Sequence, residues 1–329
     1  MIDTKEKLID LSDTGLSDAE LFASCPQDAS AVEKITAPRY SYWKSVGRVF
    51  FHKKSNIVVL LMLAIILVFT FIYPSFAGFD KYANIMDPSA KHLTPGQAFQ
   101  KFGFSIHWLF GTGESGQSTF DGLWYGARIS ISIALICALI NFTIGILLGA
   151  VWGFSKKVDM VLNEIRNVIV VVPGTFVTSV LMMVFSPSFW TLIFSMCITG
   201  WIGIAYSIRT QVIIIRDRDY NLASKCLGSS TLRIATKNIL PFMISFIVTM
   251  AATSLPGYIG SEAFLSYIGL GISEMTLGKI LFNSQAAMVT PGWGWEFWCP
   301  VMLSAFISIV LFLVGQSLGD AADPRTHML

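Results

Sequence analysis

The sequence predicts an all-α protein that crosses a membrane six times. Hydrophobic residues make up 53% of the 329 residues, charged residues only 13%, and the mean hydropathy is +0.62. These values lie outside the profile of a soluble domain. The apolar residues are gathered in blocks between polar segments, and a helix needs about 20 apolar residues to cross a bilayer. Composition and block pattern together therefore indicate membrane spans.

Residues 1–55 form a polar tail that is acidic at first and basic near its end. The tail has no apolar core, so we expect no cleavable signal peptide. Aromatic residues alternate with cations over Tyr40–Lys54, which is typical of an interfacial helix leading into a membrane. The first span follows at 56–76. Its core, Ile57–Tyr73, carries no charge, and we expect Pro74 to end it.

Residues 77–123 form a long loop with two patterns that resemble nucleotide-binding motifs. Gly111–Gly116 fits G-x-G-x-x-G, and Gly111–Ser118 fits a P-loop, except that Gln117 stands where the phosphate-binding Lys belongs. A real site of either kind needs a preceding strand and a following helix in a βαβ unit. This run lies between two membrane spans instead, so we interpret it as a turn-rich loop.

Five further apolar blocks lie in residues 124–319. We place the second to sixth spans at Ala127–Gly153, Asn167–Phe185, Phe189–Ile213, Ile239–Ile259 and Val301–Leu318. Ser155–Arg166 is interpreted as a short loop. Residues 260–298 are apolar but too broken for a span, and we interpret them as a helix end, a re-entrant or amphipathic segment, and an aromatic belt at Trp293, Trp295 and Trp298. Residues 320–329 form a polar tail.

Glycine and proline mark special positions in three of the spans. Glycines recur at four-residue spacing over Gly145–Gly153, so their bare backbones form a stripe that another helix can approach closely. The third span contains Pro173 and Gly174, and the fifth is interrupted by Pro256 and Gly257. Proline removes a helical hydrogen bond and clashes with the preceding turn. We therefore predict that these two pairs are hinge or gating residues.

The distribution of positive charge predicts the orientation of the spans. With the N-terminus in the cytoplasm, the inside segments hold seventeen of the 23 Lys and Arg residues, and the outside loops hold four. Cytoplasmic segments of membrane proteins carry such an excess. We therefore expect both termini and the segment Asp219–Pro241 to be cytoplasmic.

Residues that commonly perform chemistry are scattered along the chain. The five cysteines form no C-x-x-C pair, the four histidines show no metal-ligand spacing, and no Ser, His and acid set shares one depth. No ionisable residue lies at the predicted centre of a span, where ion-coupled carriers usually hold one. The net charge of +2 offers no surface for nucleic acid. We expect no catalytic, cofactor or metal residue; a secondary carrier or channel and a membrane enzyme remain as alternatives.

The segment Asp219–Pro241 is the longest stretch between two spans on the predicted cytoplasmic side. Apolar residues interleaved with cations predict a short helix, a break at Gly228–Ser230 and a second helix. Such a surface is suited to docking. Its composition alone leaves open whether it docks on lipid or on a protein.

Residues 222–241, LASKCLGSSTLRIATKNILP, resemble the coupling segment of bacterial ATP-binding-cassette importer permeases, roughly E-A-A-x-x-x-G followed by I-x-x-x-x-x-L-P. Leu222 replaces the Glu of that pattern. The resemblance assigns ATPase coupling to Ala223, Ser224, Lys225, Gly228, Ser229, Arg233, Leu240 and Pro241. It implies that small residues permit close approach of an ATPase, while Lys225 and Arg233 pair with acids on its rim.

Further stretches extend the resemblance over about residues 105–326. LFGT at 109–112, YGARISISIAL at 125–135, TGWIGIAYSIR at 199–209, SEAFLSYIGLGI at 261–272 and LGDAADPR at 318–325 are similar to the dipeptide and oligopeptide permease branch, specifically its C-type subunit. At Glu114–Ser118 the chain departs from that family, which usually has G-R-D after an acidic residue.

The resemblance implies the architecture and partners of a type I importer permease in a bacterial cell membrane. The partners would be a second, homologous permease subunit, two cytoplasmic ATPases that bind ATP and Mg²⁺, an extracytoplasmic peptide-binding protein and membrane lipid. The chain itself would be a non-catalytic subunit that forms half of the path for oligopeptides. Dipeptides or nickel are the alternative substrates within the same family.

Overall fold

The computed structural model describes residues 42–323 except 81–83, 85, 231 and 232. These residues are helical and contain no strand, only an isolated bridge between Thr112 and Ser118. In chain order the elements are α2 (Tyr42–His52), α3 (Lys54–Leu67), η2 (Val68–Ile72), α4 (Tyr73–Ala77), η3 (Pro88–Ala90), α5 (Pro95–Phe102), η4 (Ile106–Trp108), α6 (Thr119–Phe154), α7 (Lys156–Val170), α8 (Gly174–Val184), α9 (Phe189–Arg216), α10 (Asp219–Cys226), η5 (Ile234–Ile239), α12 (Leu240–Leu265), η6 (Ser266–Leu270), α13 (Leu277–Asn283), α14 (Gln285–Val289) and α15 (Gly294–Ala322).

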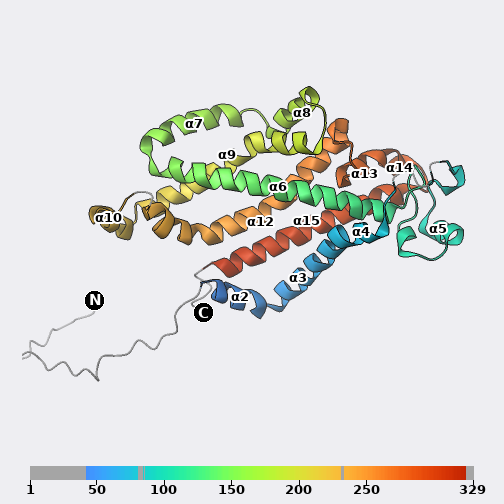
Figure 1. Ribbon diagram of the computed structural model, residues 1–329, viewed down its shortest axis with the longest axis horizontal. Helices are drawn as coiled ribbons and strands as arrows, with labels where there is room; N and C mark the ends of the chain where they lie inside the picture. Colours follow the sequence, from blue (N-terminus) through green and yellow to red (C-terminus); the bar gives the residue numbers. More distant parts are fainter. Residues whose placement is uncertain (1–41, 81–83, 85, 231–232, 324–329) are drawn as a thin grey trace, which may run out of the picture. The chain divides into compact units, whose positions relative to one another are not determined.

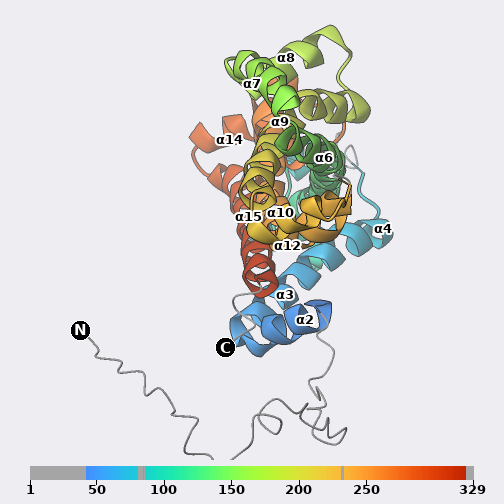
Figure 2. The same cartoon turned by 90° about the vertical axis from the view of Figure 1, so that its left-hand side faces the viewer.

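Five helices in the described residues are long and apolar enough to cross a membrane. They are Lys54–Ala77, Thr119–Phe154, Phe189–Arg216, Lys237–Leu270 and Gly294–Ala322. Helices α7 and α8 together form a sixth candidate, bent by 71° at the break between them. Figure 1 shows α6, α9, α12 and α15 running side by side, with α10 at one end and α5 and α14 at the other. Figure 2 shows α7 and α8 on one side of them and α2 and α3 on the opposite side.

The sequence predicted that Pro74 ends the first span, but the structure shows that the span continues past this residue. Pro74 lies in the first turn of α4, and the helix continues to Ala77, after which Gly78 adopts a left-handed conformation with φ 63°. Proline would clash with the carbonyl four residues earlier in a regular helix. The wider π-helical turn η2, Val68–Ile72, immediately precedes it. This turn accommodates the ring, so the helix continues past the proline.

The sequence analysis missed helix α7 but predicted the bend that follows it. Ser155–Arg166 was expected to be a loop, but α7 spans Lys156–Val170. Its apolar residues are interleaved with polar ones and none of its residues is buried, so the segment lacks the continuous apolar block by which spans are recognised. The predicted kink is confirmed, because α7 and α8 meet at 71° beside Pro173.

The predicted interruption of the fifth span at Pro256 and Gly257 is wrong. Helix α12 runs through both residues, and the span continues into the π-helical turn η6. Membrane helices tolerate an internal proline where neighbouring helices, Ser or Thr side chains or local changes in helical pitch satisfy the backbone groups that it frees. The break comes at Gly269, whose φ is 84°. The sixth span likewise begins before Val301, at Gly294, and takes in Trp295 and Trp298 of the predicted aromatic belt.

The glycine stripe of α6 brings it close to α9, as predicted. A Cβ atom on Gly149 would lie 2.5 Å from the carbonyl oxygen of Ala205 and 2.8 Å from Cβ of Ile208. One on Gly145 would lie 2.6 Å from Ile204 Cγ2. Such distances are closer than packed atoms can approach. The stripe therefore fixes the distance between α6 and α9.

Alanine substitution should have opposite effects on a glycine of this stripe and on an exposed glycine of α9. Gly149→Ala is expected to destabilise the chain by about 1–3 kcal/mol, because the backbone of α9 must move away. Gly203→Ala, on α9, has nothing within 4 Å of the added Cβ and should stabilise by up to about 1 kcal/mol through helix propensity. Thermal unfolding of each variant in detergent measures both effects. Equal shifts would show that the stripe does not govern packing.

Candidate functional site

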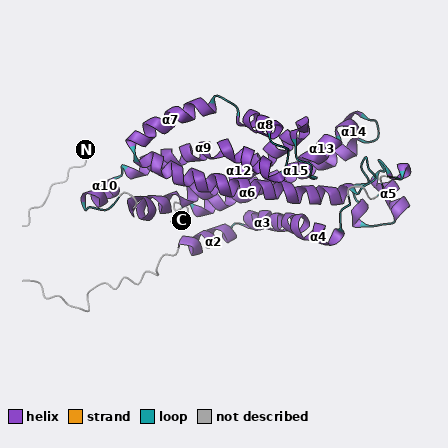
Figure 3. Cartoon of the chain, turned by 45° about the horizontal axis from the view of Figure 1, so that its top comes forward, coloured by secondary structure: helices purple, strands orange, loops and turns teal. Residues whose placement is uncertain are grey.

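The segment Asp219–Pro241 folds as a short helix, a reversal and a second helix that leads into α12, with residues 231 and 232 outside the description (Figure 3). Helix α10 ends in a Schellman motif: Ser229 N–H donates to Ser224 O at 3.1 Å and Gly228 N–H donates to Lys225 O at 3.0 Å. Gly228 has φ 83°, a conformation that favours glycine. The turn thus favours glycine at this position.

The eight predicted coupling residues differ in how far they are exposed to solvent. Those that are exposed are Ala223, Lys225, Gly228, Arg233 and Pro241, whereas Ser224, Ser229 and Leu240 are half-buried. Two leucines beside them are also exposed, Leu227 by 87% and Leu222 by 47%. Apolar side chains on a short helix beyond the ends of the spans form a surface suited to docking.

Two asparagines that sequence reasoning missed hold α10 in place. Asn221 is 2% exposed; its Nδ2 donates to Ile215 O at 2.8 Å. Its Oδ1 accepts from Asn238 Nδ2 at 3.1 Å, and Asn238 also donates to Ser224 Oγ at 3.4 Å. α10 is therefore fastened to the end of α9 and to η5. A lone Asn in a polar segment gives no sequence signal for such a role.

A second set of polar contacts connects α9 to α7 and α6. Arg209 donates through Nε and Nη2 to the two carboxylate oxygens of Asp159, at 2.7 and 2.8 Å. Trp152 Nε1 donates to the same carboxylate at 2.8 Å, and the Arg166 guanidinium lies 3.9 Å from the centre of the Tyr206 ring. Since α9 continues into α10, these contacts connect α7 to the segment Asp219–Pro241.

The four predicted hinge residues differ in their surroundings. Pro173 and Gly174 are exposed at the bend between α7 and α8, and a Cβ on Gly174 would meet only Thr199 Oγ1, at 3.4 Å. Gly257 lies within continuous helix beside Pro256 and has nothing within 4 Å of its Cβ position. A bend is thus present at the first pair and absent at the second. Motion at either pair remains a prediction.

Glu262 carries a buried carboxyl group and lies within a candidate span. The sequence analysis had placed this residue outside the spans. It is 0% exposed and accepts from Ser130 Oγ at 2.7 Å and from Ser266 Oγ at 2.8 Å. Ser130 Oγ in turn accepts from Leu277 N–H at 3.1 Å. The network joins α6, α12 and α13. Because the predicted fifth span ended at Ile259, Glu262 fell in the segment 260–298, which was interpreted as a helix end followed by a re-entrant or amphipathic segment.

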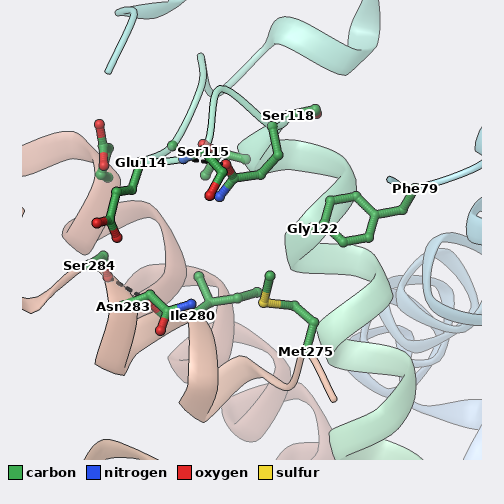
Figure 4. A pocket seen from close by; sticks show the side chains of 13 residues that line it. Phe79, Glu114, Ser115, Ser118, Gly122, Met275, Ile280, Asn283 and Ser284 are labelled. Atoms are coloured by element: carbon green, nitrogen blue, oxygen red, sulfur yellow. Dashed lines mark hydrogen bonds between the residues drawn. The ribbon is translucent and has the colours of Figure 1, made fainter. Parts of the chain in front are cut away.

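A small cavity of about 60 Å³ lies at the opposite end of the helices from α10. Glu114 and Ser115 come to it from the loop, and Asn283 and Ser284 from the α13–α14 region (Figure 4). Glu296 also lines it. The P-loop-like run around this cavity turns back on itself through the Thr112–Ser118 bridge, and the described residues before it contain no strand. It therefore has the turn-rich form expected from the sequence.

Two histidine–carboxylate contacts fasten the loop to the spans near this cavity. His92 Nδ1 lies 2.7 Å from Glu296 Oε1, and His107 Nδ1 lies 2.9 Å from Asp121 Oδ2. Tyr73 donates to Asp121 Oδ1 at 2.5 Å. In the loop itself, hydrogen bonds from Lys101 and Ser89 lower the pKa of Asp87 to about 2. In the described residues, no group of three or more His, Cys, Asp or Glu could hold a metal ion.

Comparison with known proteins matches nearly the whole chain. The family model described as "Binding-protein-dependent transport system inner membrane component" matches residues 141–328. The chain is 44% identical to the oligopeptide transport system permease protein AmiD of Streptococcus pneumoniae, over 94% of this chain and 98% of that protein. It is 32% identical to the oligopeptide transport system permease protein OppC of Bacillus subtilis, over 93% and 97%. It is 36% identical to the dipeptide transport system permease protein DppC of Bacillus subtilis, over 67% and 69%. A chain of the MetNI methionine ABC transporter aligns with a TM-score of 0.47 and 17% identity, over 61% of this chain and 94% of that chain.

Proposed function

This chain belongs to the family of binding-protein-dependent transport system inner membrane components and is a membrane permease subunit of a peptide importer; we propose that it forms half of the translocation path for oligopeptides and couples that path to a cytoplasmic ATPase. The all-α polytopic fold that the sequence predicts is confirmed in the described residues, and the family model places it among importer permeases. The substrate proposal is supported mainly by the likeness to AmiD along almost the full length of both proteins.

The coupling part of the proposal is supported by the exposed surface of the segment Asp219–Pro241. This segment presents apolar Leu227 and cationic Lys225 and Arg233 beyond the ends of the spans, while Asn221 fastens α10 from behind. In this proposal α10 sits in a cleft of an ATPase subunit, and ATP-driven closure moves the segment. ATP and Mg²⁺ bind the partner ATPases, and this chain supplies no catalytic residue.

The assembly proposed around the chain has the partners that its family implies. A second homologous permease completes the path, two ATPases supply energy, and an extracytoplasmic peptide-binding protein delivers the substrate. The excess of Lys and Arg supports a cytoplasmic position for both termini and for the segment Asp219–Pro241. The bend at Pro173, and the proline at 256, are the proposed points of movement.

Replacing Gly228 tests the coupling proposal. Gly228→Val forces a β-branched residue to φ 83°, at a strain of about 1–2 kcal/mol, and so should reshape the end of α10. We expect ATPase assembly or peptide uptake to fall at least tenfold in the reconstituted importer, with normal membrane insertion. Gly228→Asn, which tolerates this conformation better, should retain more uptake.

Gly78 offers a matched control for that substitution. It also ends a helix with positive φ, 63°, and like Gly228 it has nothing within 4 Å of its Cβ position. Gly78→Val should therefore carry similar local strain without affecting coupling. Equal losses of uptake in Gly78→Val and Gly228→Val would contradict a special role for the segment Asp219–Pro241.

The substrate is tested by competition uptake with di- and oligopeptides and with nickel. Displacement of a labelled oligopeptide by other oligopeptides, but not by dipeptides or nickel, is the expected result. Transport by the purified chain without any ATPase would favour the alternative of a secondary carrier and overturn the coupling proposal.

A further inference from the structure

A second and larger cavity, of about 380 Å³, lies between α10 and the ends of two spans. Phe154, the last residue of α6, and Arg216, the last residue of α9, both line it. Both helices are candidate spans that end at these residues. The cavity therefore lies at one end of two candidate spans, where a membrane surface is expected.

The charged residues that line this cavity are mostly positive. Lys156, Arg216 and Lys225 line it together with a single carboxylate, Asp217. That carboxylate is already paired with Arg216, whose Nε lies 3.0 Å from Asp217 Oδ1, while Arg216 Nη1 donates to Gly153 O at 2.5 Å. In the part of the chain that the structure describes, neither lysine forms an ion pair. The ammonium groups of both lysines are thus available to bind a ligand.

The start of α7 adds to the positive potential. Ser155 caps this 15-residue helix, with its Oγ accepting from Val158 N–H at 3.4 Å, and Lys156 is the first residue after the cap. The free N–H groups of a helix N-terminus carry partial positive charge and favour anions. Asp159 in the same turn is occupied by Arg209. Helix end and lysines therefore favour the same kind of ligand, an anion.

The remaining wall of the cavity is apolar. Phe154, Leu222 and Ile234 line it beside the cations, and Leu222 is 47% exposed. A free inorganic anion gains nothing from apolar contacts, whereas a phospholipid carries a phosphate and apolar chains on one molecule. Basic pockets between helices at a membrane surface are suited to lipid head groups. The cavity thus combines the two chemistries that an anionic lipid offers.

We propose that this cavity binds the phosphate head group of an anionic phospholipid, held by Lys156, Arg216 and Lys225 with its glycerol and acyl region against Phe154, Leu222 and Ile234. The lipid would fill the space behind α10 and so connect the membrane surface to the segment Asp219–Pro241. The proposal goes beyond the proposed function and does not depend on the substrate or on the orientation of the chain.

Lipid titration of the full-length chain in a neutral detergent tests this proposal. Phosphatidylglycerol and phosphatidylcholine are added in mixed micelles, and binding is followed by native mass spectrometry. Phosphatidylglycerol is expected to bind at least tenfold more tightly. The double variant Lys156→Gln with Lys225→Gln should bind it roughly thirtyfold more weakly, at about fivefold per cation. Leu222→Glu, which places a carboxylate in the cavity, should also weaken binding.

The matched control removes two exposed lysines that do not line the cavity. Lys157→Gln with Lys237→Gln takes the same charge from the same two regions of the chain. Its affinity for phosphatidylglycerol should change less than threefold. Equal losses in the two double variants, or equal affinity for the two lipids, would overturn the proposal.

Two further measurements separate the lipid from other anions. Inorganic phosphate that displaces phosphatidylglycerol at millimolar concentration would identify a free-anion site and overturn the lipid assignment. An ATPase subunit that displaces the lipid, and fails to bind the Lys156→Gln and Lys225→Gln variant, would identify an acidic side chain of the partner as the ligand. Retention of phosphatidylglycerol in the assembled importer supports the proposal.

Discussion

Glu262→Ala is expected to destabilise the chain by about 3 kcal/mol or more. The substitution removes a completely buried side chain and leaves the hydroxyls of Ser130 and Ser266 without the carboxylate that accepts from them. A buried polar group left without its hydrogen-bond partner costs about 1–3 kcal/mol, and the vacated volume adds to that cost. Thermal or denaturant unfolding of the purified chain measures the effect.

The consequences of this substitution should extend to α13. Ser130 Oγ also accepts from Leu277 N–H, so the start of α13 loses part of its anchor when Glu262 is removed. Residues of α13 line the cavity at the loop end, and we expect faster hydrogen exchange there. Glu262→Gln keeps one acceptor oxygen and should have a smaller effect, of about 1 kcal/mol.

Glu274→Ala is the control for Glu262. Glu274 lies in the same part of the chain but is exposed, so its replacement should change stability by less than about 0.5 kcal/mol. If both alanine variants unfolded at the same temperature, the network around Glu262 would contribute nothing measurable to stability.

Asp159→Asn is expected to loosen α7 and to reduce transport about tenfold. No residue of α7 is buried, so its position depends on polar contacts with α9, chiefly the two-pronged Asp159–Arg209 pair. The side chains of this pair are 17% and 25% exposed, and because solvent screens them partly we expect a loss of about 1–3 kcal/mol. Limited proteolysis within α7 and peptide uptake by the assembled importer provide the measurements.

Variants on both sides of the pair separate charge from geometry. Arg209→Lys keeps the positive charge but loses the planar two-pronged contact, so its uptake should be intermediate. Glu164→Gln removes an acid from an exposed position on the same helix and should leave uptake unchanged. A double-mutant cycle with no coupling between Asp159→Asn and Arg209→Gln would contradict the role given to this pair.

The apolar blocks determined most of the fold because their signal is local. Each span needs about 20 apolar residues, and four-residue spacing of Gly145, Gly149 and Gly153 marks a packing face without knowledge of the partner helix. The local structure of the segment Asp219–Pro241 was also predictable, because Gly228 and the alternation of apolar and basic residues indicate a helix, a turn and a second helix. The family resemblance assigns a coupling role to these residues, and that role stays a proposal.

Local sequence patterns gave wrong predictions where the structure of a segment depends on its surroundings in the fold. Pro74 and Pro256 were assigned as breaks, yet a π-helical turn accommodates the first and the second lies within continuous helix. Helix α7 was missed because an amphipathic helix on the outside of a bundle has no apolar block. Glu262 was placed outside the predicted spans because nothing in the neighbouring sequence indicates a contact with Ser130, which lies 132 residues away.

By itself the sequence determined that the chain is a helical membrane protein and where most spans lie, and it predicted that the segment Asp219–Pro241 is a docking surface. Those properties follow from hydropathy, periodicity and turn-forming residues, all of which act over a few residues. Only the tertiary structure decided which polar groups meet: Arg209 with Asp159, Glu262 with Ser130, and three cations around one cavity. Such pairings depend on how distant helices pack, and no local pattern records that.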